Sequence, residues 1–485
     1  MKQTLKIIAV CLLLANTANL CAQTKTFTRD YTYQASEVDS KVSSRTNATT
    51  EMRNILLREI GTYMRTEQVF VTTGNTQEYK EKIEAITAGI VEMKVLDEKW
   101  NGETYWIKAE MTINPKEVEQ KVKEISEDKQ RVKELEESRA RTKAAEEEAD
   151  RLRKELAELR KQKASEQKIA EKESNYNKQI NTLSAEEYYT KGQNSYYKGE
   201  YTQTVEYFKQ ALSINPDYAV AQCFLGFMYS EGKGVKQDYY EAIKWFRKSA
   251  EQGYAAAQYN LAVMYDNGRG VTKDNYEAVK WFRKSAEQGD VMAQNNLGNM
   301  YRAGVGVPQD YNEAAKWFRK SAEQGYAMAQ CNLGIMYQAG YGVTKDYNEA
   351  VKWYRKSAEQ GNVSAQYYLG YMYQNGRGVS QNDNEAAKWY RKSAEQGNAN
   401  AQRDLGVMYQ YGYGVPQDSY EAVRWYRKSA EQGDATGQCR LAVMYDNGDG
   451  VQRSESQAIE WYKKAARQEY KFAIDRLKEL GITSY

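Results

Sequence analysis

Apolar and polar positions follow the same pattern in successive copies along residues 218–469, with a period of 36 residues. In each copy a first segment places leucine, methionine and tyrosine on one stripe, and a second segment carries tryptophan followed by phenylalanine or tyrosine. A fixed period in the thirties indicates a solenoid of stacked helical pairs, because each pair covers the apolar face of its neighbour. The seven tryptophans that mark the period are Trp245, Trp281, Trp317, Trp353, Trp389, Trp425 and Trp461.

Each second helix has a predicted start and a predicted stop. Asp274 followed by Glu277 forms a capping box, in which each side chain accepts a hydrogen bond from a backbone amide near the helix start. The same pattern recurs in every copy. Gly289 can end the helix with a positive φ. Between the helices, Gly304 and Gly306 permit a tight reversal that side chains would obstruct.

The end of the array departs from this pattern. Glu469 stands where the other copies have the helix-ending glycine. Leu477 is in register with Leu441 of the last full copy. Residues 470–485 are therefore predicted to form a terminal helix that covers the last repeat.

Two repeat families are indicated by these residues. Residues 184–217 resemble a tetratricopeptide repeat, opened by a capping box of Ser184 and Glu187 and closed by Pro216 after its second helix. Residues 218–469 resemble seven Sel1-like repeats, the slightly longer relatives of that motif. The resemblance implies a mainly α fold, a right-handed α-solenoid. One copy shows the matching parts: Ala257-Gln258, Leu261, Met264-Tyr265, Gly268-Arg269-Gly270-Val271, Glu277-Ala278, Trp281-Phe282-Arg283-Lys284 and Ala286-Glu287-Gln288-Gly289.

A small α+β domain is predicted at residues 26–114. An alternating stretch, a long helical pattern and two strand-like runs follow one another, and Asn101-Gly102 between the two runs predicts an antiparallel hairpin. The order of elements, Arg53-Asn54-Ile55-Leu56-Leu57 and Gly61 resemble the α+β domain of flagellar assembly protein T and related outer-envelope lipoproteins. That resemblance implies an envelope location and no chemistry. The segments are Phe27–Tyr33, the pattern through Met52, Ile55, Leu56, Ile60 and Met64, Ile90–Leu96 and Tyr105–Ile113.

Residues 116–180 are rich in charges of both signs, and no proline or glycine interrupts residues 116–173. This composition favours one long exposed helix of roughly 85 Å. Two heptad-like apolar patches are separated by charged residues. A short dimeric coiled coil through which the chain self-associates and a single helical spacer both fit this pattern. The patches are Val118, Val122 and Ile125, and Leu152, Leu156 and Leu159.

The first 22 residues are typical of an export signal. Lys2 and Lys6 precede the apolar run Ile7–Leu14, which is too short to span a bilayer. We expect an exported bacterial protein of the periplasm or cell envelope. Leu20 is bulkier than the small residue that normally precedes a lipid-bearing cysteine, which argues against an anchor at Cys21. No later segment predicts a transmembrane span.

The remaining cysteines, Cys223, Cys331 and Cys439, occupy the same repeat position three repeats apart. Because packed helices lie roughly 8–10 Å apart, the three Cα atoms exceed the roughly 7 Å limit for a bridge. We therefore expect isolated thiols, with intermolecular pairing as the only disulfide route.

One face of the first helices varies between copies and is the candidate binding groove. In the first copy Val220, Cys223, Phe224 and Phe227 are spaced as one helical face. The family resemblance implies that first helices line the concave surface, and tyrosine and methionine are common interface anchors. The alternative to a binding groove is unconstrained sequence variation on a solvent-exposed face. The candidate residues for a protein or peptide partner are Phe224, Phe227, Tyr259, Asn260, Asn295, Asn296, Asn299, Asn332, Tyr367, Tyr368, Tyr371, Arg403, Asp404 and Arg440.

A basic triplet recurs on each second helix, as in Lys244, Arg247 and Lys248, beside Glu241 and Glu251. A solvated face with ion pairs inside the helix fits this pattern. A ridge that docks an envelope polymer is the alternative.

Catalytic and cofactor chemistry has little support in the sequence. The chain has no histidine, which excludes Ser-His-Asp and Cys-His mechanisms and the usual zinc sites. The net charge of +3 gives no basic field for nucleic acid. No catalytic, cofactor or metal residue is assigned. The alternatives to a partner-binding scaffold are a spacer without a ligand and an enzyme handling β-lactams or cell-wall fragments, as some cysteine-rich Sel1-like proteins suggest.

Overall fold

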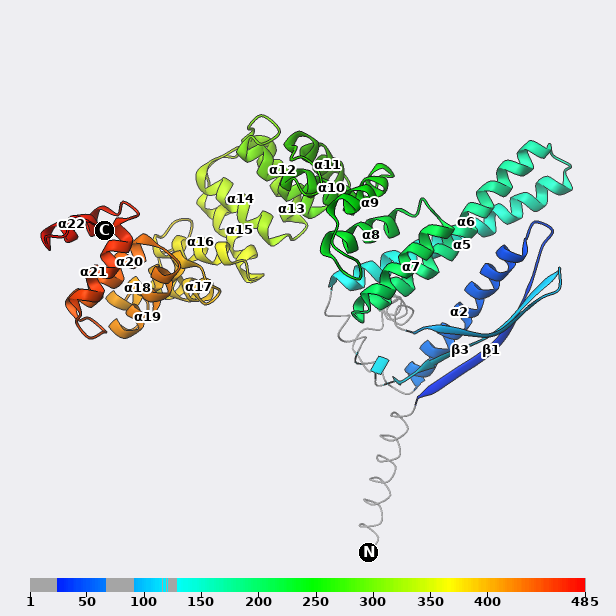
Figure 1. Ribbon diagram of the computed structural model, residues 1–485, viewed down its shortest axis with the longest axis horizontal. Coiled ribbons are helices and arrows are strands. Elements are labelled where there is room, and N and C mark those ends of the chain that lie inside the picture. Colours follow the sequence, from blue (N-terminus) through cyan, green and yellow to red (C-terminus); the bar gives the residue numbers. More distant parts are fainter. Residues whose placement is uncertain (1–23, 67–90, 116, 119, 121–128, 485) are drawn as a thin grey trace, which may run out of the picture. The chain divides into compact units, whose positions relative to one another are not determined.

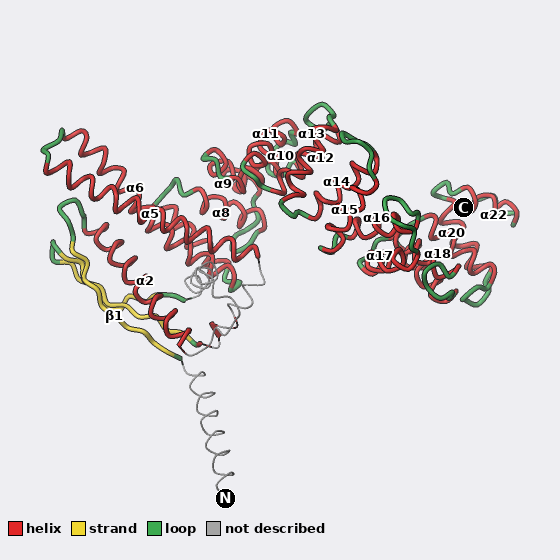
Figure 2. The backbone as a smooth tube through the Cα atoms, turned by 180° about the vertical axis from the view of Figure 1, so that it is seen from behind, coloured by secondary structure: helices red, strands yellow, loops and turns green. Residues whose placement is uncertain are grey.

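The computed structural model describes residues 24–66, 91–115, 117–118, 120 and 129–484 (Figures 1 and 2). The predicted export signal and Cys21 lie outside the described residues. The chain divides into two compact units, Met1–Gln252 and Gly253–Tyr485. Among the described residues no helix has both the length and the apolar surface that a bilayer span requires.

The first unit begins with the predicted α+β domain. Strands β1, β3 and β2 form an antiparallel sheet in that order, and helix α2 packs on one face of it (Figure 1). The hairpin prediction is confirmed at Asn101, whose Oδ1 accepts hydrogen bonds from the amides of Glu103 and Thr104 at 2.9 and 2.7 Å. The elements are β1 (Lys25–Gln34), α2 (Lys41–Thr66), β2 (Met93–Trp100) and β3 (Thr104–Ile113).

The alternating pattern of β3 explains how this domain folds. Its odd-numbered residues from Tyr105 to Ile113 are buried, while Lys108 and Thr112 are exposed on the other face. The buried side chains meet Met52, Leu56 and Ile60 of α2. A strand period of two and a helical stripe therefore close one small core.

The prediction of one long charged helix is wrong. The described part of this region forms two helices, α5 (Lys129–Lys161) and α6 (Glu166–Tyr197), joined by a turn in which Lys163 has φ 52°. Leu152 and Leu156 of α5 are buried against Tyr176 and Ile180 of α6. The second heptad-like patch therefore packs within one chain, which removes it as a dimer interface. Val118 lies in the core of the α+β domain, and the rest of the first patch lies outside the described residues.

The capping box predicted at Ser184 is also wrong. Ser184 lies inside α6, where its hydroxyl bonds Thr46 of α2 at 3.0 Å. Helix α6 therefore serves both as a partner of α5 and as the first helix of the tetratricopeptide-like pair, with α7 (Tyr201–Ile214) as the second. The close approach of α6 and α7 needs Gly192, because a Cβ there would lie 2.5 Å from the ring of Phe208.

Helical pairs follow from residue 219 onward, as predicted (Figures 1 and 2). The first pair, α8 (Ala219–Glu231) and α9 (Tyr239–Glu251), belongs to the first unit. The second unit contains α10 (Ala255–Asn267), α11 (Asn275–Glu287), α12 (Val291–Ala303), α13 (Tyr311–Glu323), α14 (Ala327–Ala339), α15 (Tyr347–Glu359), α16 (Val363–Gln374), α17 (Asp383–Glu395), α18 (Ala399–Tyr411), α19 (Ser419–Glu431), α20 (Ala435–Asn447), α21 (Glu455–Ala466) and α22 (Lys471–Glu479).

The recurring apolar residues form the core of the second unit. Leu333 is fully buried and Trp353 is 7% exposed. Both side chains belong to a core cluster with residues of α13, the second helix of the preceding repeat. Two polar contacts recur beside this core. Ser357 donates to the carbonyl of Ala327 at 2.6 Å, and Gln360 donates to the side chain of Gln330 at 2.7 Å. The glutamine at the end of each second helix thus ties that helix to the first helix of the same repeat.

The predicted capping boxes are half confirmed. Asp274 accepts hydrogen bonds from the amides of Tyr276 and Glu277 at 3.0 Å, and each equivalent residue caps its helix. The return bond from Glu277 is not the contact formed. The amide of Asp274 donates to the carbonyl of Tyr265, and Glu277 forms an ion pair with Lys280 at 2.8 Å. The first helix therefore supplies the acceptor that the box would have supplied.

The paired loop glycines do more than permit a turn. Both Gly304 and Gly306 have positive φ, but a Cβ on Gly306 would also lie 2.3 Å from the carbonyl oxygen of Asn275 in the repeat before it. The loop can press against that repeat only without a side chain. The second glycine is therefore an inter-repeat contact.

The array ends as predicted, with one unexpected detail. Ala473 and Leu477 of α22 are fully buried on the last repeat. Glu469 keeps the left-handed conformation of the glycines that it replaces, with φ 61°. The helix stop therefore survives in a residue that favours it poorly.

Candidate functional site

The predicted binding stripe lies on the first helices, but its members are only partly open to solvent. The stripe residues that the sequence singled out are half-buried, except Asn295, which is 1% exposed. They form contacts between neighbouring repeats. We number repeat positions from the start of each first helix, so that Tyr259 is at position 5 and Asn260 at position 6.

At three junctions in the second unit, position 5 of one repeat pairs with position 6 of the next. The side chain of Asn332 donates to Oδ1 of Asn295 at 2.9 Å. Tyr259 is hydrogen-bonded to Asn296, and Tyr367 to Asp404. Variation along the stripe is therefore matched in pairs, so packing constrains positions that vary from copy to copy.

Arg403 is the most strongly held charge of the stripe. Its Nε donates to Asp404 at 2.8 Å, its Nη1 donates to Asn400 at 3.0 Å, and Nη1 lies 3.6 Å from Asp434. Burial, Asp404 and Arg403 act on Tyr367, and burial dominates, so the pKa of Tyr367 rises to about 12. Arg403 and Asp404 thus act mainly within the fold, and only 18% and 20% of their side chains are exposed.

The tyrosines of the stripe stack on the second helices. Tyr368 stacks on Tyr354 with ring centroids 5.2 Å apart, and Tyr367 lies 5.7 Å from Tyr390. Tyr371 is half-buried and is covered in part by Arg377. The stripe therefore offers edges of rings to a partner.

Other stripe residues also have partners. Asn299 accepts from Arg302 at 3.2 Å, and Arg440 lies over the ring of Tyr426 at 6.0 Å. In the first unit Phe224 packs on Tyr189 at 5.6 Å. Phe227 lies 6.2 Å from Tyr196.

The open part of the same helix face is at position 2. Met292 is 40% exposed and Met328 is 50% exposed, on neighbouring first helices. Methionine adapts its shape to irregular partners. These two residues lie outside the paired contacts, and they form the accessible edge of the stripe.

Position 12 explains another change between repeats. The buried hydroxyl of Tyr354 donates to Gln338 at 2.6 Å, and Tyr390 and Tyr426 each donate to a glutamine at the same position. Repeats with phenylalanine in place of this tyrosine, at position 28, have no glutamine at position 12; Phe318 is an example. Comparing the copies could have revealed this pairing.

Each residue of the recurring basic triplet has a contact within the protein. Lys280 pairs with Glu277 at 2.8 Å, Lys284 lies 4.3 Å from the ring centre of Trp281, and Arg283 donates to Tyr301 of the next repeat at 2.7 Å. These contacts support the solvated face with internal pairs that the sequence predicted.

The three cysteines are free and buried. Burial raises the pKa of Cys331 and of Cys439 to about 12. The prediction of isolated thiols is confirmed. An intermolecular bridge would require the repeats to open, so the intermolecular route loses its support.

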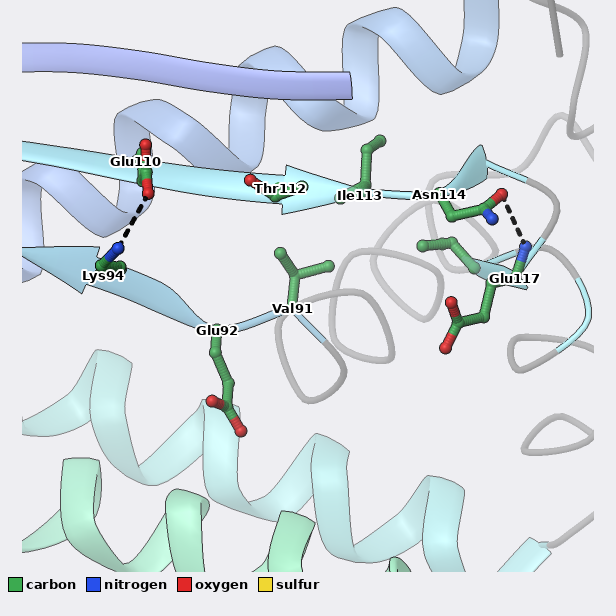
Figure 3. A pocket seen from close by; sticks show the side chains of 9 residues that line it. Val91, Glu92, Lys94, Glu110, Thr112, Ile113, Asn114 and Glu117 are labelled. Atoms are coloured by element: carbon green, nitrogen blue, oxygen red, sulfur yellow. Dashed lines mark hydrogen bonds and ion pairs between the residues drawn. The ribbon is translucent and has the colours of Figure 1, made fainter. Parts of the chain in front are cut away.

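A cavity of about 290 Å³ lies where β2 begins and β3 ends; there Lys94 pairs with Glu110 at 3.5 Å and Glu92 points away from them (Figure 3). None of the candidate stripe residues lines it. Within the described residues no group of three or more carboxylate, cysteine or histidine side chains could hold a metal.

The family described as Sel1 repeat matches seven consecutive segments of 36 residues, residues 219–254, 255–290, 291–326, 327–362, 363–398, 399–434 and 435–470. They cover just over half of the chain. The chain belongs to the Sel1 repeat family, whose members are generally protein-interaction scaffolds.

A solved structure shows the same repeat fold. A protective antigen present in uropathogenic Escherichia coli strains is 40% identical with a TM-score of 0.56, over 61% of this chain and 64% of that protein. The alignment thus spans less than two thirds of that antigen. A Sel1 repeat protein from Oxalobacter formigenes is 32% identical with a TM-score of 0.49, over 60% of this chain and 86% of that protein. No curated protein matches the sequence.

Proposed function

We propose that this protein is an exported bacterial scaffold that captures a protein or peptide partner on the first-helix face of its repeats. One observation carries the proposal: this face changes from repeat to repeat, while its outer edge exposes Met292 and Met328. Membership of a family of protein-interaction scaffolds supports it.

The partner contacts are expected at the accessible edge and the half-buried rings beside it. Tyrosine is enriched among the residues that dominate interface energies, and methionine is enriched at interfaces, where its flexible side chain adapts to irregular surfaces. Met292, Met328 and Tyr371 are therefore the proposed anchors. Arg403 and Asp404 are proposed to shape the face through their mutual pair rather than to bind directly.

A crosslinking experiment tests this proposal. A photoreactive amino acid at Met328 should crosslink a defined protein in the native host, identified by mass spectrometry. The variant Met292→Ser/Met328→Ser/Tyr371→Ala should lose that capture while circular dichroism shows that its helices remain folded, although Tyr371 also packs on the core and its loss should lower the melting temperature. Tyr276→Ala/Tyr420→Ala is the matched control, because both rings are 70% exposed on second helices. Capture that survives the triple variant, or no crosslink from position 328, would reject the proposal.

Export is tested separately. Mass spectrometry of the protein from its host should find a mature N-terminus near Gln23, without a lipid on Cys21. An N-terminus at Met1 in a cytoplasmic fraction would contradict export and leave the binding proposal intact.

A further inference from the structure

A second surface arises where the glycine loops meet the preceding repeat. A Cβ on Gly342 would lie 1.9 Å from the carbonyl oxygen of Tyr311, and one on Gly378 would lie 2.2 Å from that of Tyr347. The residue just before each of these glycines is thereby held close to the start of the neighbouring second helix. We call Tyr341, Arg377 and Tyr413, which occupy this place in three consecutive repeats, the loop-apex platform.

Each member of the platform lies over tyrosine rings. Tyr341 stacks on Tyr311 with centroids 4.7 Å apart and planes 13° apart, and 46% of Tyr341 remains exposed. Tyr413 stacks on Tyr411 at 5.7 Å, with 47% and 52% of the two residues exposed. One ring face is covered in each stack, so the other is available to a ligand.

Arg377 occupies the middle of the platform. Its Cζ lies 5.7 Å from the ring centre of Tyr347 and 5.4 Å from that of Tyr371. Lys345 lies 5.1 Å from the ring centre of Tyr347, so two cations gather there. A hydrogen bond from Lys345 and the charges of Lys345 and Arg377 lower the pKa of Tyr347, which agrees with a positive local potential. Nearby Asp346 is engaged in capping α15.

We propose that the loop-apex platform is a second docking surface, and that it binds an extended acidic protein segment. Exposed tyrosine and arginine are the residues that most often dominate protein interfaces. The two cations favour carboxylates, and arginine pairs with a carboxylate through two hydrogen bonds.

The order of the platform favours an extended chain. Tyr341, Arg377 and Tyr413 recur at the 36-residue period of the repeats. A peptide that runs from one repeat to the next would therefore meet them in succession. The platform does not include Met292 or Met328 and adjoins the first-helix edge only at Tyr371, on which Arg377 lies. The inference therefore goes beyond the proposed function.

The test uses a fluorescent peptide with four Glu-Glu-Tyr units and the full chain in an anisotropy titration. We expect binding that weakens with added salt and at least tenfold weaker binding by Arg377→Gln and by Tyr341→Ala/Tyr413→Ala. Arg269→Gln is the matched control, because Arg269 holds the same loop position in an earlier repeat. Its effect should stay below twofold. Circular dichroism establishes that each variant is folded.

Three results would overturn the inference. They are undetectable binding of the acidic peptide, equal binding of a Lys-Lys-Tyr peptide, and tighter binding of a glucuronic-acid hexasaccharide, which would assign the surface to glycans. Met292→Ser/Met328→Ser should leave peptide binding unchanged, so failure of one proposed surface is distinguishable from failure of the other.

Discussion

The two units use polar contacts in opposite ways. In the first unit the fully buried carboxylate of Asp39 accepts from Tyr176 at 2.6 Å and from the amide of Ser36 at 2.8 Å, and it lies near Arg153. This network occurs once. In the second unit, contacts such as that between Gln360 and Gln330 recur in each repeat. A unique network concentrates stability in a few residues, whereas a repeated one spreads it along the array.

The largest expected effect breaks the unique network. Asp39→Ala leaves Arg153, Tyr176 and Tyr33 without their buried acceptor, and should destabilise the first unit by about 3–5 kcal/mol. Hydrogen exchange should rise in the α+β domain and stay unchanged in the second unit. Asp97→Ala, at a site with a 51% exposed side chain, is the control. If hydrogen exchange in the α+β domain were equally slow in both variants, Asp39 would not be essential for the stability of the first unit.

A smaller effect is expected from one inter-repeat contact. Gly342→Ala forces a Cβ toward the carbonyl oxygen of Tyr311 and should cost roughly 3 kcal/mol. Gly325 has φ 95° and open space around its Cα, so Gly325→Ala should cost only roughly 1 kcal/mol. Denaturant unfolding of the full chain measures the difference. Equal losses would mean that backbone strain alone explains both glycines.

The pairing of glutamine at position 12 with tyrosine at position 28, as in Gln338 and Tyr354, can be tested with a double-mutant cycle. Gln338→Met leaves the buried hydroxyl of Tyr354 unpaired and should cost about 1–3 kcal/mol. Adding Tyr354→Phe removes that hydroxyl and should restore most of the loss. Additive effects of the two changes in thermal unfolding would refute the coupling.

The smallest expected effect is a gain in stability. Glu469→Gly removes the strain of a non-glycine residue in the left-handed conformation and should stabilise the last repeat by about 1 kcal/mol. The converse change Gly433→Glu at the equivalent site should destabilise by a similar amount. A melting temperature that falls with Glu469→Gly would show that the glutamate has another stabilising contact.

Periodicity predicted the repeat architecture because each copy repeats the same local signals, from the cap at Asp274 to the stop at Gly289. It failed where one contact satisfies a group that another motif would normally satisfy. Ser184 is a good cap by sequence, but α6 continues through it because Thr46 takes its hydroxyl. The charged helix breaks near Lys163 so that Leu156 can pack on α6, and no local sequence signal specifies that partner.

The residues of the candidate stripe lie on the first helices, and the sequence did not predict their contacts between repeats. Single positions looked free because each varies between repeats. The constraint appears only when Asn295 is compared with Asn332 of the next repeat, a separation of 37 residues that a search within one repeat cannot reveal. The loop-apex platform was missed for the same reason, since Tyr341 meets Tyr311 across a repeat boundary.

Helix α6 joins two tasks in a single rod of 32 residues, from Glu166 to Tyr197. At 1.5 Å per residue it extends for about 48 Å without a break. Its first turns pack on α5, and its last turns form half of the first helical pair. A force applied to the hairpin of α5 and α6 would therefore reach that pair through one continuous helix.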